Sequence, residues 1–249
     1  MNGAPHMPIT RTAEEYRPMS NPDALPPAVQ DLARRLGADP GLPGATVRLS
    51  QSGHIKLDGL PWWLPFGAEQ TIAAGTCAFA WTARIGPLGA LRVCDALEQT
   101  GGRLDVSLFG TIPLAHMART PALRKGELLR YLAELPWAPD AIIGNPALRW
   151  RVEAPDRIAV SAGAGEAASE VALSLNGEGH IAGVYAADRP RSATPPIRPT
   201  PWRGSFSDYR YHAGRWLPFA GEVAWEVGGV EQVYWRGTLL AWEIDHDHA

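Results

Sequence analysis

The stretch GELLRYLAELPW, residues 126–137, is the clearest amphipathic helix in a chain whose other patterns indicate strands and turns. At about 100° per residue, one side of the helix predicted over residues 123–135 is made of leucines. These are Leu128, Leu129, Leu132 and Leu135. The opposite side is a polar stripe made of Glu127, Arg130, Tyr131 and Glu134. The leucine side predicts that the helix packs on a sheet, and we expect the rest of the fold to be arranged around it.

The polar stripe has two interpretations that the sequence leaves open. In the first it is a solvated ladder, because Glu127, Arg130 and Glu134 form i,i+3 and i,i+4 pairs worth roughly 0.2–0.5 kcal/mol each. In the second it lines a concave surface, with Tyr131 and Trp137 as walls. The second interpretation predicts that Arg130 and Glu134 are at least partly buried and paired.

Strands are predicted on both sides of the helix, because apolar and polar residues alternate between turn signals. The predicted strands are 46–57, 63–72, 79–85, 91–98 and 103–109 before the helix, and 148–153, 157–161, 170–175, 180–187, 202–211, 216–227 and 232–244 after it. A short helix is predicted over residues 26–36. Residues 110–121 are expected to be irregular, and the proline-rich stretch 188–201 is expected to be a loop outside any ladder.

Two hairpins share a sequence pattern. Residues 63–69 read WLPFGAE and residues 216–222 read WLPFAGE, and each segment opens the return strand of a hairpin. The repeat predicts two sheet halves built on a similar hairpin; a coincidence within a common hairpin style is the alternative.

The bulk composition narrows the function classes. The net charge of −3 argues against a general nucleic-acid binder. Lys and Arg are spread along the chain, so no run of them would attract an anionic membrane. The ten tryptophans suit a broad sheet face or the wall of an apolar pocket.

Segment composition predicts the organisation and the compartment. We expect residues 1–24 to be a flexible arm, residues 25–245 one domain and residues 246–249 a tail. Residues 1–20 carry charges and no apolar core, which does not fit a signal peptide, and residues 71–83 are too short to span a bilayer. Cys77 and Cys94 lack metal or redox spacing and are expected to be buried free thiols. The cytoplasm is therefore the expected location.

A second polar cluster lies in residues 206–212. On a strand, Phe206, Asp208, Arg210 and His212 share one face and Tyr209 lies on the other. Either that face is solvated, or an Asp208–Arg210 pair fixes the polar end of a ligand. Such a network could also include other charged residues: Glu69, Glu222, Asp188 and Arg189.

Cofactor signals are weak throughout. His54 and His212 are interpreted as satisfied surface imidazoles, and the tail residues His246 and His248 as solvated. The chain has no zinc-protease, paired Cys-x-x-Cys, phosphate-loop or Gly-x-Ser-x-Gly motif. We therefore predict no cofactor and no metal.

Several segments together resemble a bacterial family of unknown function. They are residues 63–70, the helix segment 126–139, Ala187-Asp188-Arg189, residues 202–210 and Trp235-Arg236-Gly237. The helix segment is the most specific of them, and the resemblance covers most of residues 25–244. It implies a fold similar to the curved antiparallel half-barrels of lipoprotein carriers, which hold a hydrophobic ligand. It implies no activity.

These observations predict an α+β fold in which a strongly curved antiparallel sheet of about ten strands packs against the central helix. The first predicted function is a binding protein for an apolar or amphipathic small molecule in a Trp-lined cleft. The predicted ligand-binding residues are Arg130, Tyr131, Trp137, Tyr209, Arg210, Trp63 and Trp81. The alternatives are a hydrolase or isomerase in the same cleft and a scaffold without ligand. The candidate catalytic carboxylates are Glu127, Glu134 and Asp208.

Overall fold

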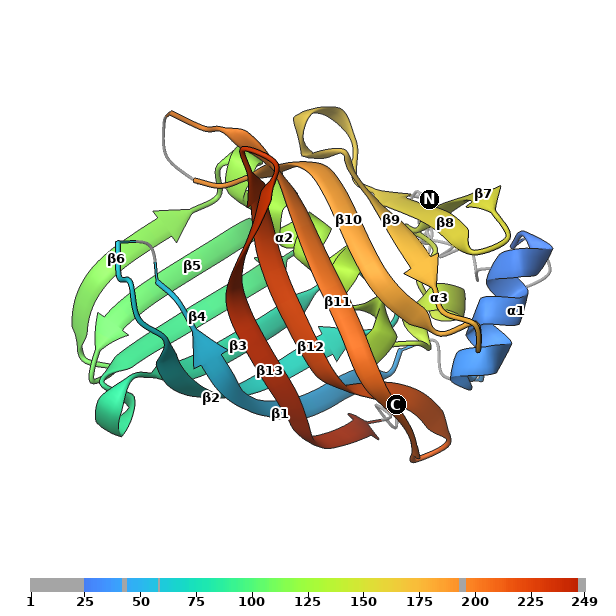
Figure 1. Ribbon diagram of the computed structural model, residues 1–249, viewed down its shortest axis with the longest axis horizontal. Helices are drawn as coiled ribbons and strands as arrows, with labels where there is room; N and C mark the ends of the chain where they lie inside the picture. The colour runs from blue at the N-terminus through green and yellow to red at the C-terminus, as the bar shows by residue number, and fades with distance from the viewer. Residues whose placement is uncertain (1–24, 42–43, 58, 193–195, 246–249) are drawn as a thin grey trace, which may run out of the picture.

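The computed structural model describes residues 25–41, 44–57, 59–192 and 196–245, which form one antiparallel sheet of thirteen strands with helices against it (Figure 1). The strands of the first half are β1 (Thr46–Ile55), β2 (Leu64–Ala73), β3 (Phe79–Ile85), β4 (Leu91–Glu98), β5 (Gly101–Leu108) and β6 (Ile112–Ala118). Those of the second half are β7 (Arg149–Ala154), β8 (Arg157–Ala162), β9 (Ser169–Leu175), β10 (Ile181–Pro190), β11 (Pro199–His212), β12 (Arg215–Val227) and β13 (Val230–Asp245).

The sheet is two meanders joined where the first strand meets the last. Strands β1 to β6 follow one another outward to one edge, and β7 to β13 return from the other edge until β13 pairs with β1. The edge strands β6 and β7 are connected by α2 (Pro121–Ala133), η3 (Leu135–Trp137) and α3 (Ala141–Gly144). The helix α2 contacts β4 and β5 from one half and β8, β9 and β10 from the other. It therefore holds the two halves of the curved sheet together.

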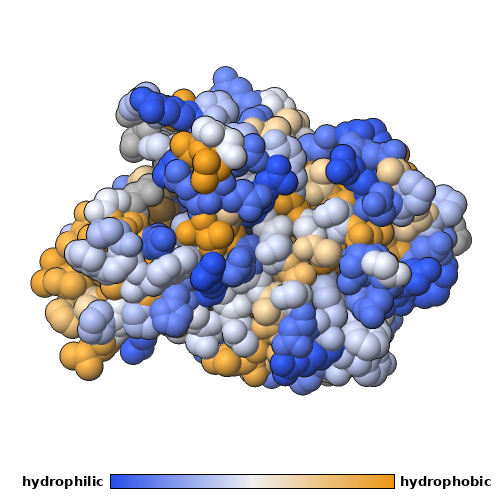
Figure 2. Space-filling view, in the orientation of Figure 1, coloured by the Kyte–Doolittle hydropathy of each residue, from blue (hydrophilic) through white to orange (hydrophobic). Residues whose placement is uncertain are grey.

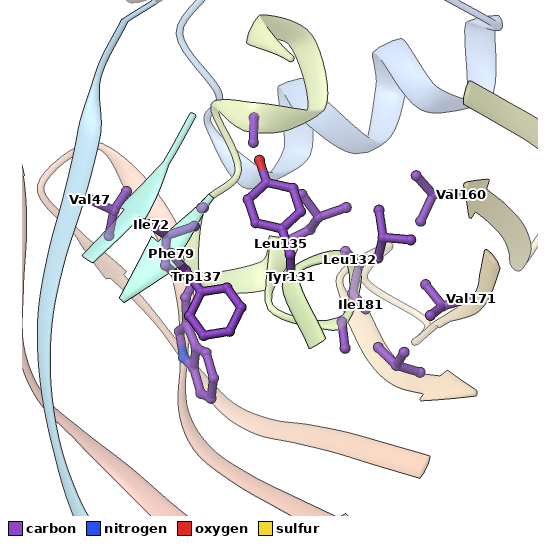
Figure 3. Close-up of a cluster of buried hydrophobic side chains, with 14 of the residues drawn as sticks. Val47, Ile72, Phe79, Tyr131, Leu132, Leu135, Trp137, Val160, Val171 and Ile181 are labelled. Carbon is purple, nitrogen blue, oxygen red and sulfur yellow. The ribbon is translucent and has the colours of Figure 1, made fainter. Parts of the chain in front are cut away.

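The helix α2 begins at a capped turn and is buried on both sides. The Thr120 hydroxyl accepts a hydrogen bond from the Leu123 amide at 3.1 Å, and Pro121 occupies the first helical turn, where its missing N–H costs nothing. Leu129 and Leu132 are fully buried, and Figure 3 shows Leu132 near the strand residues Val160, Val171 and Ile181. Each such leucine contributes about 1.5–3 kcal/mol to stability by leaving water.

The N-terminal helix α1 (Pro27–Leu36) covers the region beside α3 and β12. Its buried side is apolar, and the helix ends at Gly37, whose left-handed φ of 78° allows the chain to turn. Close by, Arg215 of β12 makes two hydrogen bonds to the fully buried Asp140, of 2.8 and 3.1 Å, and the Asp39 amide donates to the same carboxylate at 2.8 Å. This bidentate pair fixes the end of the helical connection on β12. Two further 3-10 turns are η2 (Pro87–Gly89) and η4 (Gly165–Ala167).

The predicted fold class was wrong in its strand count and its balance of helix and strand. The described residues form thirteen strands rather than about ten, in one large open sheet with few helices, so the chain is mostly β rather than α+β. Residues 112–118, expected to be irregular, are the edge strand β6. Pro113 obscures its pattern; an edge strand tolerates proline, and the pairing with β5 shifts register at that point.

The proline-rich stretch 188–201 was also interpreted wrongly. Strand β10 continues to Pro190 and β11 begins at Pro199, and these two prolines face each other in the ladder. Both sit at the ends of long strands, where a ladder N–H is not required.

The expected arm at residues 1–24 and the tail at 246–249 lie outside the described residues. In the part of the chain that the structure describes, no helix is both long and apolar enough to cross a membrane. Cys77 and Cys94 are free thiols, as expected, but both are half-buried rather than buried. Burial raises the pKa of Cys77, against the opposing effects of a hydrogen bond from Asn145 and the charge of Arg149.

Candidate functional site

The register of the sheet aligns chemically distinct residues in rows on the face that α2 covers. One row crosses the first half of the sheet through Leu49, Gln70, Trp81 and Asp95. A second row crosses the junction of the halves through Ile55, Trp235, Val223 and Gly204. The first row brings polar groups to α2, and the second is apolar.

A cavity of about 210 Å³ lies between these rows and the C-terminal end of α2. Its aromatic walls are Trp81, Trp137, Trp202, Phe206, Tyr234 and Trp235. The volume equals about seven water molecules at ~30 Å³ each. Because drug-sized ligands occupy about 300–1,000 Å³, this cavity fits a small molecule or one end of a longer one.

Glycines on β12 and β13 make room for the aromatic wall. A Cβ atom at Gly237 would lie 2.2 Å from the ring of Trp235, and one at Gly221 would lie 3.5 Å from it. The indole of Trp235 can therefore lie across β13 only because residue 237 has no side chain. Trp137 packs edge-on against Phe206 at 5.2 Å between ring centroids and donates its indole N–H to the Pro218 carbonyl at 2.9 Å.

The polar end of the cavity is an ion cluster centred on Arg130. Its guanidinium binds Asp95 at 2.6 Å and Glu134 at 2.8 Å, and all three side chains are between 11% and 16% exposed. Gln70 donates a hydrogen bond to the second oxygen of Glu134. The guanidinium also lies over the rings of Phe79 at 4.8 Å and Trp81 at 5.0 Å. Burial by itself lowers the pKa of Arg130, but the surrounding carboxylates outweigh it and raise the pKa.

A third buried carboxyl, Glu127, lies one helical turn before Arg130. Its Oε2 atom and the Oδ1 atom of Asp95 have no other hydrogen-bond partner, although the two carboxyls are within hydrogen-bonding reach of each other. Two ionised carboxylates cannot bond to each other, but one proton between them satisfies both atoms. Burial and the Asp95 charge raise the pKa of Glu127 well above its ordinary value, against the opposing charges of Arg189 and Arg130. These influences favour the protonated form of Glu127.

Two buried donors of the cavity have no partner within the described residues. They are the amide Nε2 of Gln51 and the indole Nε1 of Trp81, and both side chains line the cavity. Arg189 also lines it, with its guanidinium 4.4 Å from the ring of Trp202 and no carboxylate within ion-pair distance among the described residues. Arg189 can therefore donate hydrogen bonds to an acceptor on an occupant of the cavity.

Most predicted residues of the helix do meet at this cavity. The expectation that Arg130 and Glu134 are partly buried and paired is confirmed, and Trp81 and Trp137 line the wall. Tyr131 does not reach the cavity. It is fully buried on another side of α2, where its hydroxyl donates to the Ala73 carbonyl at 2.9 Å and accepts from Asn145 at 2.9 Å. Burial is the main cause of its raised pKa. Its hydroxyl is used in contacts within the fold.

Of the predicted cluster on β11, Phe206 lines the cavity, whereas its charged residues and Tyr209 do not. Asp208 and Arg210 form an exposed pair at 2.5 Å, which corresponds to the solvated alternative, and their hydrogen bonds lower the pKa of Asp208. Tyr209 donates to the Ile181 carbonyl at 2.7 Å and stacks on His180 at 4.6 Å. Trp63 lies outside the cavity, with Lys56 4.8 Å from its ring. Roles of these residues in binding stay predictions.

The repeated hairpins occupy related places, since β2 and β12 flank the central pair β1 and β13. Their glutamates differ in setting. Glu222 contacts the cavity and pairs with Arg236 at 2.8 Å, whereas Glu69 is an exposed residue of β2 without a cavity contact.

Three residues of the site were missed by sequence reasoning: Gln51 and Asp95, which line the cavity, and Gln70, which binds Glu134. Gln51 and Gln70 are polar residues at inward positions of strands, and Asp95 pairs across the ladder with Trp81. Alternation along β1 and β2 could have flagged the two glutamines as buried polar groups. No local signal links Asp95 to Arg130, because 35 residues separate them. Among the described residues, no group of three His, Cys, Asp or Glu side chains could hold a metal ion.

Comparison with known proteins identifies a family and a fold. Residues 15–237 match the model of a family of unknown function, DUF6544. A putative outer membrane lipoprotein-sorting protein domain from Vibrio parahaemolyticus is similar in structure, with a TM-score of 0.52, 8% identity, and coverage of 92% of this chain and 95% of that one. A LolA superfamily protein from Nitrosomonas europaea has a TM-score of 0.46 at 9% identity, covering 86% and 92%. No curated protein sequence matches significantly.

The match to the Vibrio parahaemolyticus domain bears on the fold alone. It confirms the expected similarity to lipoprotein-carrier half-barrels, in which one antiparallel sheet curves around a helical segment.

Proposed function

This chain belongs to the DUF6544 family of unknown function, and we propose that it binds an apolar or amphipathic small molecule between its sheet and α2. The observation that carries the proposal is the cavity of about 210 Å³ with four tryptophans in its wall. Burying an apolar ligand there would be favourable by roughly 25 cal/mol for each Å² removed from water. A ligand-free scaffold would need no such space, so the cavity opposes that alternative.

The polar groups of the cavity support an amphipathic ligand over a purely apolar one. Arg189 lines the cavity and has no carboxylate within ion-pair distance among the described residues, so its guanidinium would lack a counter-charge against a hydrocarbon. A polar or anionic group on the ligand removes that cost. The Vibrio parahaemolyticus domain of similar fold is a putative lipoprotein-sorting domain, which also fits an apolar chain as the occupant. Cytoplasmic residence is part of the same proposal, and cell fractionation tests it separately.

An enzyme is the second candidate, because one observation favours it. Glu127, whose pKa is raised, lies beside Asp95, which lines the cavity, and such a pair of carboxyls can act as acid and base. We rank it second because the oxygens of Asp95 and Glu134 that face Arg130 are already bonded, and Glu127 itself does not line the cavity.

The test is native mass spectrometry of protein purified from its host, combined with a cavity-filling variant. Val93 lines the cavity, so Val93→Phe should expel the co-purifying molecule. Val106 is its cross-strand partner on β5 and does not line the cavity, so Val106→Phe is the matched control and should keep the molecule.

Overpacking costs about 1–3 kcal/mol, and a thermal melt of each variant confirms that it is folded. A titration of tryptophan fluorescence with fatty acids, alcohols and amines of graded chain length identifies the ligand class. If nothing co-purifies and no member of the series changes the fluorescence, the binding function is wrong.

A further inference from the structure

Three apolar side chains protrude from one end of the first half of the sheet. In a meander, the connections β1–β2, β3–β4 and β5–β6 fall at the same end, and they carry Trp62, Leu88 and Phe109. These side chains are 58%, 100% and 64% exposed. We call this end, with the three connections, the apolar rim. Figure 2 shows hydrophobic residues gathered at the left of the view, the end where Figure 1 places the β3–β4 and β5–β6 connections.

Two of these side chains are held out by unfavourable backbone geometry. Leu88 has a φ of 59° and Phe109 a φ of 50°, in the left-handed region that glycine adopts without strain. Glycines stand directly beside them, at Gly89 and Gly110. A turn selected only for folding would carry glycine or asparagine at positions 88 and 109. Large apolar residues there indicate a function for the exposed side chains.

The charge around the apolar rim is basic. Arg84 and Arg92 are cross-strand partners on β3 and β4, an arrangement of like charges that destabilises a sheet. Neither makes an ion pair among the described residues. Arg84 packs against Gly89, and the guanidinium of Arg92 lies near Gly110, so each arginine stands beside the turn that carries a protruding side chain.

The described residues of the three connections and the adjoining strand ends carry no negative charge of their own, although Glu231 of β13 lies near Lys56 and Trp63. Across the described residues 56–57, 59–63, 84–92 and 107–114 there is no carboxylate side chain, while Lys56 adds a third cation. Asp58, in the β1–β2 connection, lies outside the described residues.

We propose that the apolar rim docks on the surface of an anionic lipid bilayer. The three protruding side chains would enter the boundary between headgroups and acyl chains, and Arg84 and Arg92 would contact lipid phosphates. A bilayer is favoured over a protein partner because the side chains project from three separate turns, which suits a deformable medium better than a shaped surface. The sequence showed no run of basic residues, but the pairing of β3 with β4 places two arginines opposite each other. This inference is independent of the ligand proposed for the cavity.

The experiment is co-sedimentation of the full chain with vesicles of phosphatidylcholine alone, or mixed with phosphatidylglycerol. The wild-type protein should bind the mixed vesicles, and added salt should weaken the binding. The variant L88S/F109S should bind at least about tenfold more weakly for each side chain removed. The variant R84Q/R92Q should lose the preference for phosphatidylglycerol. Leu240→Ser is the matched control, because Leu240 is 61% exposed on β13 and lies outside the apolar rim.

Two results would overturn the proposal. The first is that wild-type protein stays in the supernatant with both kinds of vesicle, or that L88S/F109S binds as well as wild type. The second is that wild-type protein self-associates in sedimentation velocity and L88S/F109S does not, while neither binds vesicles. The apolar rim would then be a contact between copies of the chain. The substituted residues Arg84, Leu88, Arg92, Phe109 and Leu240 are all exposed, so circular dichroism should show every variant folded.

Discussion

Replacing Glu127 by Gln tests whether one proton joins the carboxyls of Glu127 and Asp95. Glu127 is buried, and its pKa is raised by burial and by the Asp95 charge. The folded protein therefore keeps the proton at pH values where the unfolded chain has lost it. Glutamine carries the same donor geometry without titrating, so its amide can replace the shared proton in the contact with Asp95.

The magnitude follows from proton linkage. Above the ordinary carboxyl value of 4.5 and below the folded-state pKa, unfolding of the wild-type protein releases one proton from Glu127. The free energy of unfolding then falls by about 1.4 kcal/mol for each pH unit from this group. Its contribution to stability is fully present below 4.5 and is lost as the pH rises through the folded-state pKa. The variant lacks this loss, so its stability relative to wild type should rise by about 1.4 kcal/mol per pH unit.

Urea unfolding of both proteins, repeated from about pH 4.5 to pH 8, measures this difference, and the slope m checks that both unfold in two states. Other titrating groups cancel because they are common to both proteins. Glu166→Gln, an exposed position on η4, is the matched control for the removal of one carboxylate. A difference for Glu127→Gln that is constant with pH would refute the shared proton.

Two further substitutions test the cluster and the aromatic wall. Arg130→Met leaves two buried carboxylates without their cation and should cost about 3–5 kcal/mol in urea unfolding. The exposed Arg210→Met should cost much less, and equal losses of stability would contradict the assigned burial of Arg130. Gly237→Ala places a methyl group 2.2 Å from the Trp235 ring, so it should shift tryptophan emission and weaken binding of the cavity ligand by at least about tenfold. Unchanged emission and affinity would show that Trp235 does not form the wall.

Much of the sheet could be read from local patterns. The alternation along residues 46–57 marked β1, because a strand with one buried face repeats every two residues. The edge strand β6 was not predicted, because it is mostly exposed and contains Pro113. The ends of β10 and β11 were not predicted, because prolines at these positions indicate the end of a strand.

Less of the candidate site could be predicted from the sequence. Arg130 and Glu134 could be selected because they lie one turn apart on a recognisable helix. Tyr131 could not be separated from them, since its position on the helix alone does not show that strands cover that side too. Asp208 and Arg210 were selected as a pair that could hold the polar end of a ligand if it were buried. In the structure the pair is exposed.

The sequence by itself determined a helix, predicted over residues 123–135 and found at Pro121–Ala133, together with most of the strands and the pairing of Arg130 with Glu134. These features depend on periodicities of two and 3.6 residues. Only the tertiary structure decided that there is a cavity. It exists because β13 pairs with β1, which brings Trp235 opposite Ile55, and because α2 crosses to both halves of the sheet. Those contacts join residues far apart in the chain, and their free energy comes from burial, which no local pattern encodes.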